Sequence, residues 1–147
     1  MSRIIFQKSY IIVLPSFAST AAHRHPFLHL FCGADGCRIS AADGPMEGSC
    51  ILTGPHVQHA VPTGSGIGFF LLIDPTSRLA ERIRSRYLQN RASASIPCAE
   101  LPPAEVLNLL PDEQIIQNAE AVLAQLGLSS EPGSMTDERV SQVVENI

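Results

Sequence analysis

The sequence has no long apolar run and few basic residues, and both absences restrict its function. No apolar stretch reaches the roughly 18 residues that a membrane-spanning helix needs, so we expect a soluble protein without a membrane partner. A DNA-binding surface needs clustered Lys and Arg, whereas this chain has a formal net charge of −4 and concentrates its basic residues only between Arg78 and Arg91. We therefore expect no DNA binding by this chain alone.

The cysteines also lack a metal-binding pattern. Cys32, Cys37, Cys50 and Cys98 include no C-x-x-C pair, which is the spacing that zinc-thiolate sites ordinarily use. Their apolar neighbours indicate reduced and mostly buried thiols. The opening segment up to Leu14 has the pattern of short strands rather than that of an export signal. A cytoplasmic location is therefore expected.

Turn residues divide the first half of the chain into short segments rich in β-branched and aromatic residues. These segments lie near residues 4–6, 10–14, 23–32, 36–41, 49–53, 56–61 and 67–73. Closely spaced strands of this kind predict a small antiparallel sandwich or barrel. After Asp74 the apolar residues recur at helical spacing. We predict amphipathic helices over residues 76–88 and 112–126, a connector over 89–103, and a short helix within 103–110.

The 112–126 helix carries an apolar stripe that predicts a partner. It is formed by Ile115, Ile116, Ala119, Val122, Leu123 and Leu126. Because a small barrel would leave part of this stripe uncovered, we predict a homodimer in which this helix pairs with its symmetry mate or with the 76–88 helix. A second stripe ends at Ile147 and predicts a helix start over residues 136–147. That helix either packs on the domain or leads into a further domain.

The histidines are the best candidates for functional residues. His23, His25 and His29 have the same parity in an extended segment, so their side chains can point into one interior. His59, from a neighbouring strand, could join them. Imidazole is a common ligand of transition metals, and these four residues predict a site for a divalent ion such as Zn, Ni, Fe or Mn. Hydrogen-bonded histidines that line a polar pocket without metal are an equally weighted alternative.

Four further residues are predicted to line a ligand pocket beside the histidines, namely Phe27, Phe31, Glu47 and His56. The other carboxylates of the first half lie in predicted turns, where side chains are ordinarily solvated. No general acid or base stands out, and we assign no catalytic residue.

The histidine spacing resembles the first motif of the cupin superfamily. The motif is read as His23-x-His25-x3-His29-x6-Gly36, with His29 at the position where Glu is usual. Gly48 and His59 have the separation of the second motif, although Gly54-Pro55-His56 replaces its Pro-x-Gly and Thr63 its closing Asn. The resemblance implies a double-stranded β-helix, or jelly-roll, barrel over residues 1–74. Many cupins keep this barrel without a metal ion.

A narrower resemblance covers almost the whole chain. The run from His23 to Leu30, the Gly54-Pro55 strand with His59 and Pro62, and the segment Asp137-Glu138-Arg139-Val140 are similar to the N-terminal half of AraC-type transcription regulators. This resemblance implies a small-molecule effector, a helical dimerisation segment over residues 75–135, and contact with DNA only through a C-terminal domain that is absent here.

We therefore expect an effector-sensing and dimerisation domain rather than an enzyme. The alternative is a stand-alone metal-dependent cupin enzyme, either a dioxygenase or an isomerase, because several His ligands with open coordination positions can activate oxygen or polarise a substrate. A third hypothesis is a structural dimerisation module with an empty barrel. The sequence identifies neither the effector nor the target genes.

Overall fold

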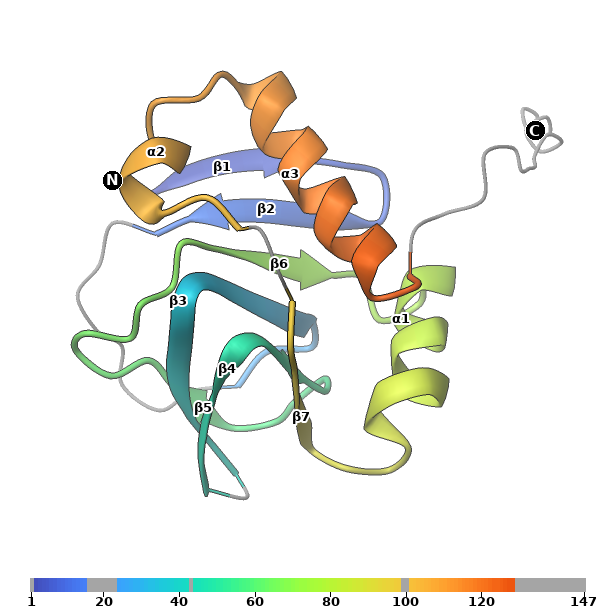
Figure 1. The fold of residues 1–147 in the computed structure, drawn as a ribbon. Coiled ribbons are helices and arrows are strands. Elements are labelled where there is room, and N and C mark those ends of the chain that lie inside the picture. Colours follow the sequence, from blue (N-terminus) through green and yellow to red (C-terminus); the bar gives the residue numbers. More distant parts are fainter. Residues whose placement is uncertain (1, 16–23, 43, 99–100, 129–147) are drawn as a thin grey trace, which may run out of the picture.

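The structure is a computed structural model that describes residues 2–15, 24–42, 44–98 and 101–128. One antiparallel sheet is followed by helices (Figure 1). The elements are β1 (Arg3–Phe6), β2 (Tyr10–Leu14), β3 (Leu28–Ala41), β4 (Gly44–Thr53), β5 (His59–Ala60), β6 (Phe69–Ile73), α1 (Arg78–Ile83), the π-helical η1 (Arg84–Leu88), β7 (Ser93–Ile96), α2 (Ala104–Leu107) and α3 (Asp112–Gln125). The prediction of a mainly β protein with C-terminal helices is confirmed.

The predicted closed barrel is wrong, because the sheet is open. The strand order is β1-β2-β6-β3-β4-β7, and β5 pairs with the far end of β3. Among the described strands, β1 pairs only with β2 and β7 pairs only with β4. Both edge strands are four residues long. Alternating short strands predict an antiparallel sheet, but closure depends on whether the two edge strands meet, and strand pattern alone does not encode this contact.

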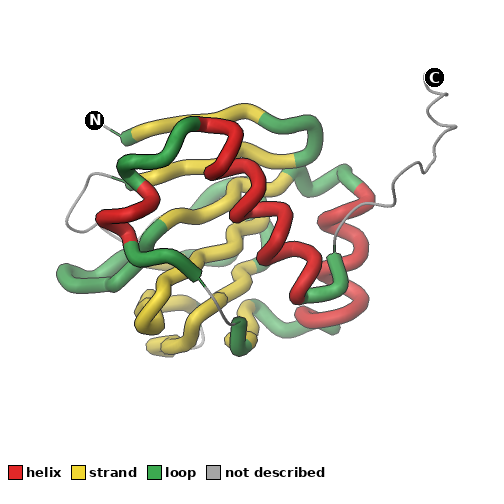
Figure 2. The backbone as a smooth tube through the Cα atoms, turned by 45° about the horizontal axis from the view of Figure 1, so that its top comes forward, coloured by secondary structure: helices red, strands yellow, loops and turns green. Residues whose placement is uncertain are grey.

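The two faces of the sheet bury different clusters because strand side chains alternate between faces. On one face the strands pack against α2 and α3, and α3 crosses that side of the sheet (Figures 1 and 2). Leu28, Leu30 and Leu52 belong to this larger cluster. The opposite face has a smaller cluster made of Phe31, Cys37, Ile39, Ile51 and Val61.

A sharp bend divides β3 into two arms. The register between β3 and β4 shifts between Cys32 and Cys37, and Gly36 has a φ of +89°, a conformation that favours glycine. A Cβ atom on Gly33 would lie 2.3 Å from the carbonyl oxygen of Gly66. These two glycines therefore allow one continuous strand to bend where the sequence predicted two separate strands.

The predicted division at residue 74 is not a boundary of the sheet. β7 follows α1 and η1 and pairs with β4 from Cys50↔Ile96 to Thr53↔Ser93. It lies inside the predicted 89–103 connector, where the residues Ser, Ala and Pro gave only a weak strand signal. The predicted helix start over residues 136–147 lies outside the described residues.

α3 is covered by the chain's own sheet. Ile115, Ala119, Val122, Leu123 and Leu126 are each at most 2% exposed and belong to the larger cluster. Five of the six stripe residues are therefore buried within the chain, and the sixth, Ile116, is partly buried against the same cluster. The predicted homodimer remains a prediction, and its contact must use another surface.

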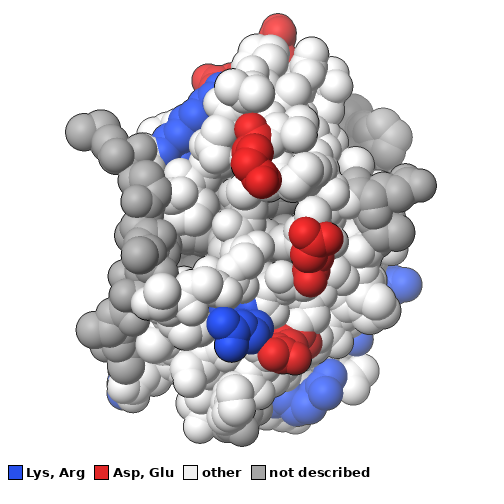
Figure 3. Space-filling model, turned by 60° about the vertical axis from the view of Figure 1, so that its left-hand side comes forward, with Lys and Arg blue, Asp and Glu red and all other residues white. Residues whose placement is uncertain are grey.

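Two surface properties bear on possible partners. On the face shown in Figure 3, acidic and basic side chains are scattered among uncharged ones. No helix among the described residues is long and apolar enough to cross a membrane.

Candidate metal centre

Three of the four predicted histidine ligands lie together on the face of the sheet opposite α3. His29 is the second residue of β3, between Leu28 and Leu30, whose side chains enter the larger core. Alternation therefore directs His29 to the other face. His25 precedes β3, and His59 is the first residue of β5. His23, the fourth predicted ligand, lies outside the described residues.

The geometry of this histidine triad is suitable for one metal ion. One ring nitrogen from each of His25, His29 and His59 lies within 4.8 Å of the other two. The ring centroids are 4.4 Å apart for His29 and His59, 5.1 Å for His25 and His29, and 5.7 Å for His25 and His59. Two nitrogens on a tetrahedral zinc ion are about 3.4 Å apart. Small ring rotations would therefore bring the triad into coordination distance.

The bend in β3 explains how residues 30 positions apart in the sequence meet. β5 pairs with the far arm of β3, where His59 is the partner of Ala41. His29 is on the near arm of the same strand. Because β3 folds back between the two arms, β5 reaches the start of the strand. The backbone N–H of His56 donates to the carbonyl oxygen of His25 at 2.6 Å and holds the 54–58 loop beside the triad.

Neighbouring groups orient the rings. Nδ1 of His59 is 3.0 Å from the carbonyl oxygen of Val57. When Nδ1 carries the ring hydrogen it donates to this oxygen, and the lone pair is then on Nε2, as in many metal-binding histidines. The ring of Phe31 stacks on His29 with centroids 5.2 Å apart, and Phe70 lies 5.5 Å from Phe31. An apolar wall therefore shields one side of the triad.

Thr53 is a residue of the site that the sequence did not indicate. It is the cross-strand partner of His29 and is fully buried. Its hydroxyl oxygen Oγ1 has no hydrogen-bond partner among the described residues. A buried hydroxyl ordinarily has a partner, and a water molecule on a bound metal would supply one. Only strand register places Thr53 beside His29, so residue spacing gave no signal for it.

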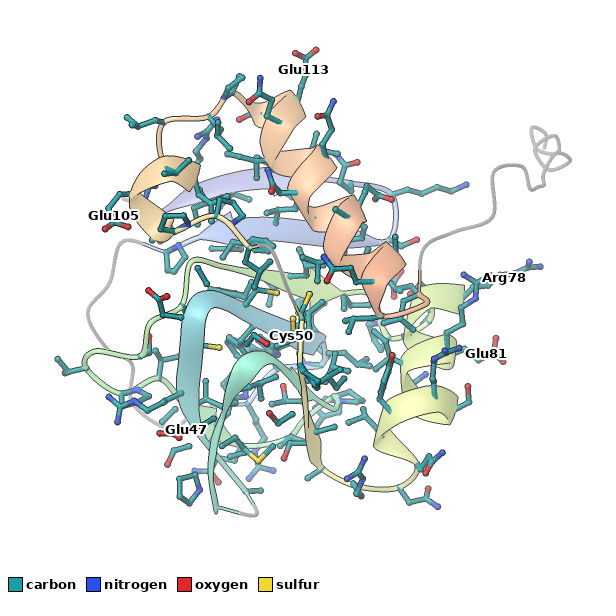
Figure 4. All side chains as sticks on the ribbon, viewed as in Figure 1. Glu47, Cys50, Arg78, Glu81, Glu105 and Glu113 are labelled. Atoms are coloured by element: carbon teal, nitrogen blue, oxygen red, sulfur yellow. The ribbon has the colours of Figure 1, made fainter. Side chains whose placement is uncertain are left out.

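The four residues predicted to line a pocket are not all in one place. Phe31 is buried against the triad, and Phe27 is half-buried just before β3. His56 is exposed in the 54–58 loop, with a φ of 60°. Glu47 is exposed on β4 and lies near the far end of the β3–β4 hairpin (Figure 4). Among the described residues, no carboxylate joins the triad.

A hollow of about 650 Å³ lies beside the 54–58 loop, between residues 54–57 and residues 81–92. Leu88 and Val57 contribute apolar surface, and Glu81, Arg84 and Arg91 contribute charges. The N–H of Gly54 donates to the carbonyl oxygen of Ala92 at 2.9 Å. Gln89 and Asn90 both have positive φ, which is uncommon for residues other than glycine. The same loop therefore borders both the hollow and the triad.

No protein-family model, curated protein or solved structure matches this chain. Function must therefore be inferred from the residues of the site.

Proposed function

We propose that this chain is a metal-binding sensor domain of a transcription regulator similar to the AraC type. His25, His29 and His59 hold one divalent first-row transition-metal ion, and a small-molecule effector binds nearby. The observation that carries this proposal is the convergence of three imidazoles, with ligand nitrogens within 4.8 Å of one another. The regulator assignment depends on the motif resemblance, and DNA contact belongs to a separate domain.

The ligand set favours a borderline metal. Neutral imidazole suits Zn, Ni and Fe(II) better than Mg or Ca, which prefer oxygen ligands. Three protein ligands also leave at least one coordination position open to water or to an effector. The Thr53 hydroxyl, buried next to His29, is placed to accept a hydrogen bond from such a water molecule.

The hollow beside the 54–58 loop is the proposed effector site. Its volume of about 650 Å³ is in the range of small-molecule pockets. Its two guanidinium groups, on Arg84 and Arg91, favour an effector that carries a carboxylate or phosphate group. An effector that shifts the 54–58 loop would also shift the neighbouring His25 and His59 and so change the affinity of the triad for metal. Bound metal would then change the affinity for the effector by the same factor, because coupling between two sites is reciprocal.

The proposed homodimer needs a surface other than the buried side of α3. Among the residues that the structure describes, the exposed large apolar side chains are Ile4 at 54%, Phe6 at 73%, Val106 at 43% and Leu109 at 85%. Ile4 and Phe6 are on β1, which is an edge strand of the described sheet and could pair with a second copy.

Metal analysis of protein purified without a His-tag tests the proposal. We expect about one equivalent of metal per chain after equilibration with zinc, and loss of high-affinity binding in His25→Ala. His56→Ala is the matched control because His56 is an exposed histidine of the adjoining loop, and it should bind like the wild type. Equal metal in all three proteins would contradict the triad assignment. Light scattering with and without metal then measures whether binding changes the oligomeric state.

The open coordination position also favours the enzyme alternative, because it can accept oxygen or a substrate. No carboxylate among the described residues joins the triad, so an enzyme of this kind would need a proton-transfer group from substrate or solvent. Metal-dependent oxygen consumption with candidate substrates would support the enzyme over the sensor.

A further inference from the structure

A row of three thiols lies on the opposite face of the sheet from the histidines. Cys32 and Cys50 are direct cross-strand partners, and their Sγ atoms are 3.8 Å apart. Both side chains are at most 2% exposed and belong to the larger core. Cys98 follows β7, which pairs with β4 at Cys50↔Ile96, and its thiol interacts with that of Cys50. Cys50, in the middle of the molecule (Figure 4), therefore has a thiol on each side.

Cys98 is the member of the row that solvent can reach, because it is only partly buried whereas the other two are fully buried. It lies outside the strand ladder, and two contacts hold it in place. Its backbone N–H donates to Ser49 Oγ at 2.7 Å, and its thiol donates to Gln125 Oε1 of α3 at 3.3 Å.

The three thiols differ in how easily they lose a proton. The hydrogen bond with Cys32 lowers the pKa of Cys50, and together with a smaller contribution from the neighbouring Cys98 thiol it outweighs the effect of burial. Burial and the neighbouring Cys50 thiol raise the pKa of Cys32 well above its ordinary value, and burial together with the charge of Cys50 raises that of Cys98 to about 12. Cys50 is therefore the best thiolate former, which suits it to the second, internal attack on Cys98, whereas the oxidant meets Cys98 first because Cys98 is the thiol that solvent can reach.

Two pairings are available to Cys50, and the backbone favours Cys98. A disulfide needs an S–S distance of about 2.05 Å and a restricted range of Cα separations. Cys32 and Cys50 are both held in paired strands, so the sheet resists the adjustment that closes their 3.8 Å gap. Cys98 lies two residues beyond Ile96, the last paired residue of β7, so the ladder does not fix its position relative to Cys50.

We propose that Cys50 and Cys98 form a reversible disulfide when the protein meets a small disulfide oxidant. The Cys98 thiolate attacks one sulfur of the oxidant, forming a mixed disulfide and releasing one oxidant thiolate. The Cys50 thiolate then attacks the Cys98 sulfur, which breaks the mixed disulfide and releases the second thiolate. The two cysteine sulfurs lose two electrons in total, the oxidant gains them, and the two cysteine protons end on the two released thiols.

This disulfide would join β4 to the segment that leads into α2 and α3. It would close a long loop between residues 50 and 98, which restricts the unfolded chain and raises stability. Oxidation would therefore tie the connector, and the helices after it, to the sheet. The triad is on the other face and contributes no atom to this site.

The test uses the full chain, reduced and then equilibrated overnight with glutathione disulfide at about pH 8.5. Remaining thiols are alkylated under denaturing conditions and counted by intact mass, and peptide mapping locates any linkage. We expect two of the four cysteines to escape alkylation, and peptide mapping to show a Cys50–Cys98 linked peptide. The Tm should rise on oxidation and return to its starting value after treatment with dithiothreitol.

Two serine variants distinguish the cysteines. Cys98→Ser should retain three alkylatable thiols and show no oxidant-dependent rise in Tm. Cys37→Ser is the matched control because Cys37 lies in the smaller cluster, and it should still form the linkage. Four free thiols in the oxidised wild type, or a linkage between Cys32 and Cys50 instead, would overturn the proposal.

Discussion

The two faces of the sheet use the same alternation of side chains for different purposes. The face under α3 buries a large cluster of aliphatic residues and thiols, in which Leu28, Leu30 and Leu52 are fully buried. The opposite face buries a smaller cluster, and it contains His29, Thr53 and His59 as buried polar residues. The helices among the described residues pack on the first face.

The comparison assigns most of the apolar packing to one face and, to the other, three imidazoles that could hold a metal ion. A fully packed aliphatic face contributes folding free energy through the apolar area that it removes from water. Buried imidazoles and a buried hydroxyl cost free energy unless they have hydrogen-bond partners or a metal. Substitutions on the α3 face should therefore change mainly the free energy of unfolding, and substitutions on the histidine face should change mainly the response to metal.

The largest expected effect is on the α3 face. Leu123→Glu places a carboxylate in the larger cluster, where Leu123 is 2% exposed. We expect destabilisation by more than about 4 kcal/mol, seen as loss of the cooperative thermal transition by circular dichroism. Ala124→Glu, at the exposed neighbouring position, is the control and should fold. A folded Leu123→Glu protein that has merely become monomeric would restore α3 as the dimer contact.

The second effect concerns the histidine face. A ligand that binds only the native state adds about 2.7 kcal/mol at a concentration of 100 times its Kd. Zinc should therefore raise the Tm of the wild type, and His59→Ala should lose this rise while keeping nearly the same metal-free stability. Differential scanning fluorimetry with and without a chelator measures both quantities. An unchanged zinc response in His59→Ala would remove His59 from the site.

A pH effect follows from the buried thiol of the smaller cluster. Burial raises the pKa of Cys37 to about 12, whereas an unfolded thiol titrates near 8.5. Between these values the unfolded chain releases the proton and the native state keeps it, so the free energy of unfolding falls as pH rises. At pH 10 the loss from this thiol is about 2 kcal/mol.

Urea unfolding at pH 7.5 and pH 10 measures whether the free energy of unfolding falls as pH rises. Cys37→Ala removes the titrating group, so its stability should fall less over the same interval. Equal losses in the wild type and the variant would show that other groups cause the alkaline destabilisation. Cys32 and Cys98 are the main competitors, because burial raises the pKa of each thiol as well and their unfolded thiols titrate in the same pH range as that of Cys37.

The smallest effect is on a polar contact at the edge of the α3 face. The Tyr10 hydroxyl on β2 donates to Glu120 on α3. A hydrogen bond to a charged group contributes about 1.5 kcal/mol at the low end of its range, and this contact is only part-buried, so Tyr10→Phe should lower the urea midpoint modestly. In a double-mutant cycle, Glu120→Gln should cost less in the Phe background than alone. Additive effects would mean that the contact contributes no coupling energy.

Local pattern predicted most of the secondary structure. Segments 10–14 and 112–126 closely match β2 and α3, because period-2 and period-3.6 patterns are set by neighbouring residues. β7 was predicted as part of a connector, because Ser93–Ile96 is short and gains its strand conformation by pairing with β4. Pairing between distant segments gives no signal in a local window.

The candidate site was predictable only in part. The shared parity of His25 and His29 suggested a common direction, and both rings lie in the triad. Glu47 was grouped with them because it lies next to Gly48 in the sequence, yet it is exposed on another part of β4. No residue pattern in the sequence indicates Thr53, because its position beside His29 depends on the β3–β4 register.

The sequence by itself determined the class of elements, the parity of the histidines and the absence of C-x-x-C pairs, since these depend only on residue type and spacing. Tertiary structure decided the bend of β3 at Gly33 and Gly36, the open sheet, and the meeting of His29 with His59. It also placed Cys98 against Cys50. These features are contacts between segments far apart along the chain, and they form only when the segments on both sides have already been positioned by packing.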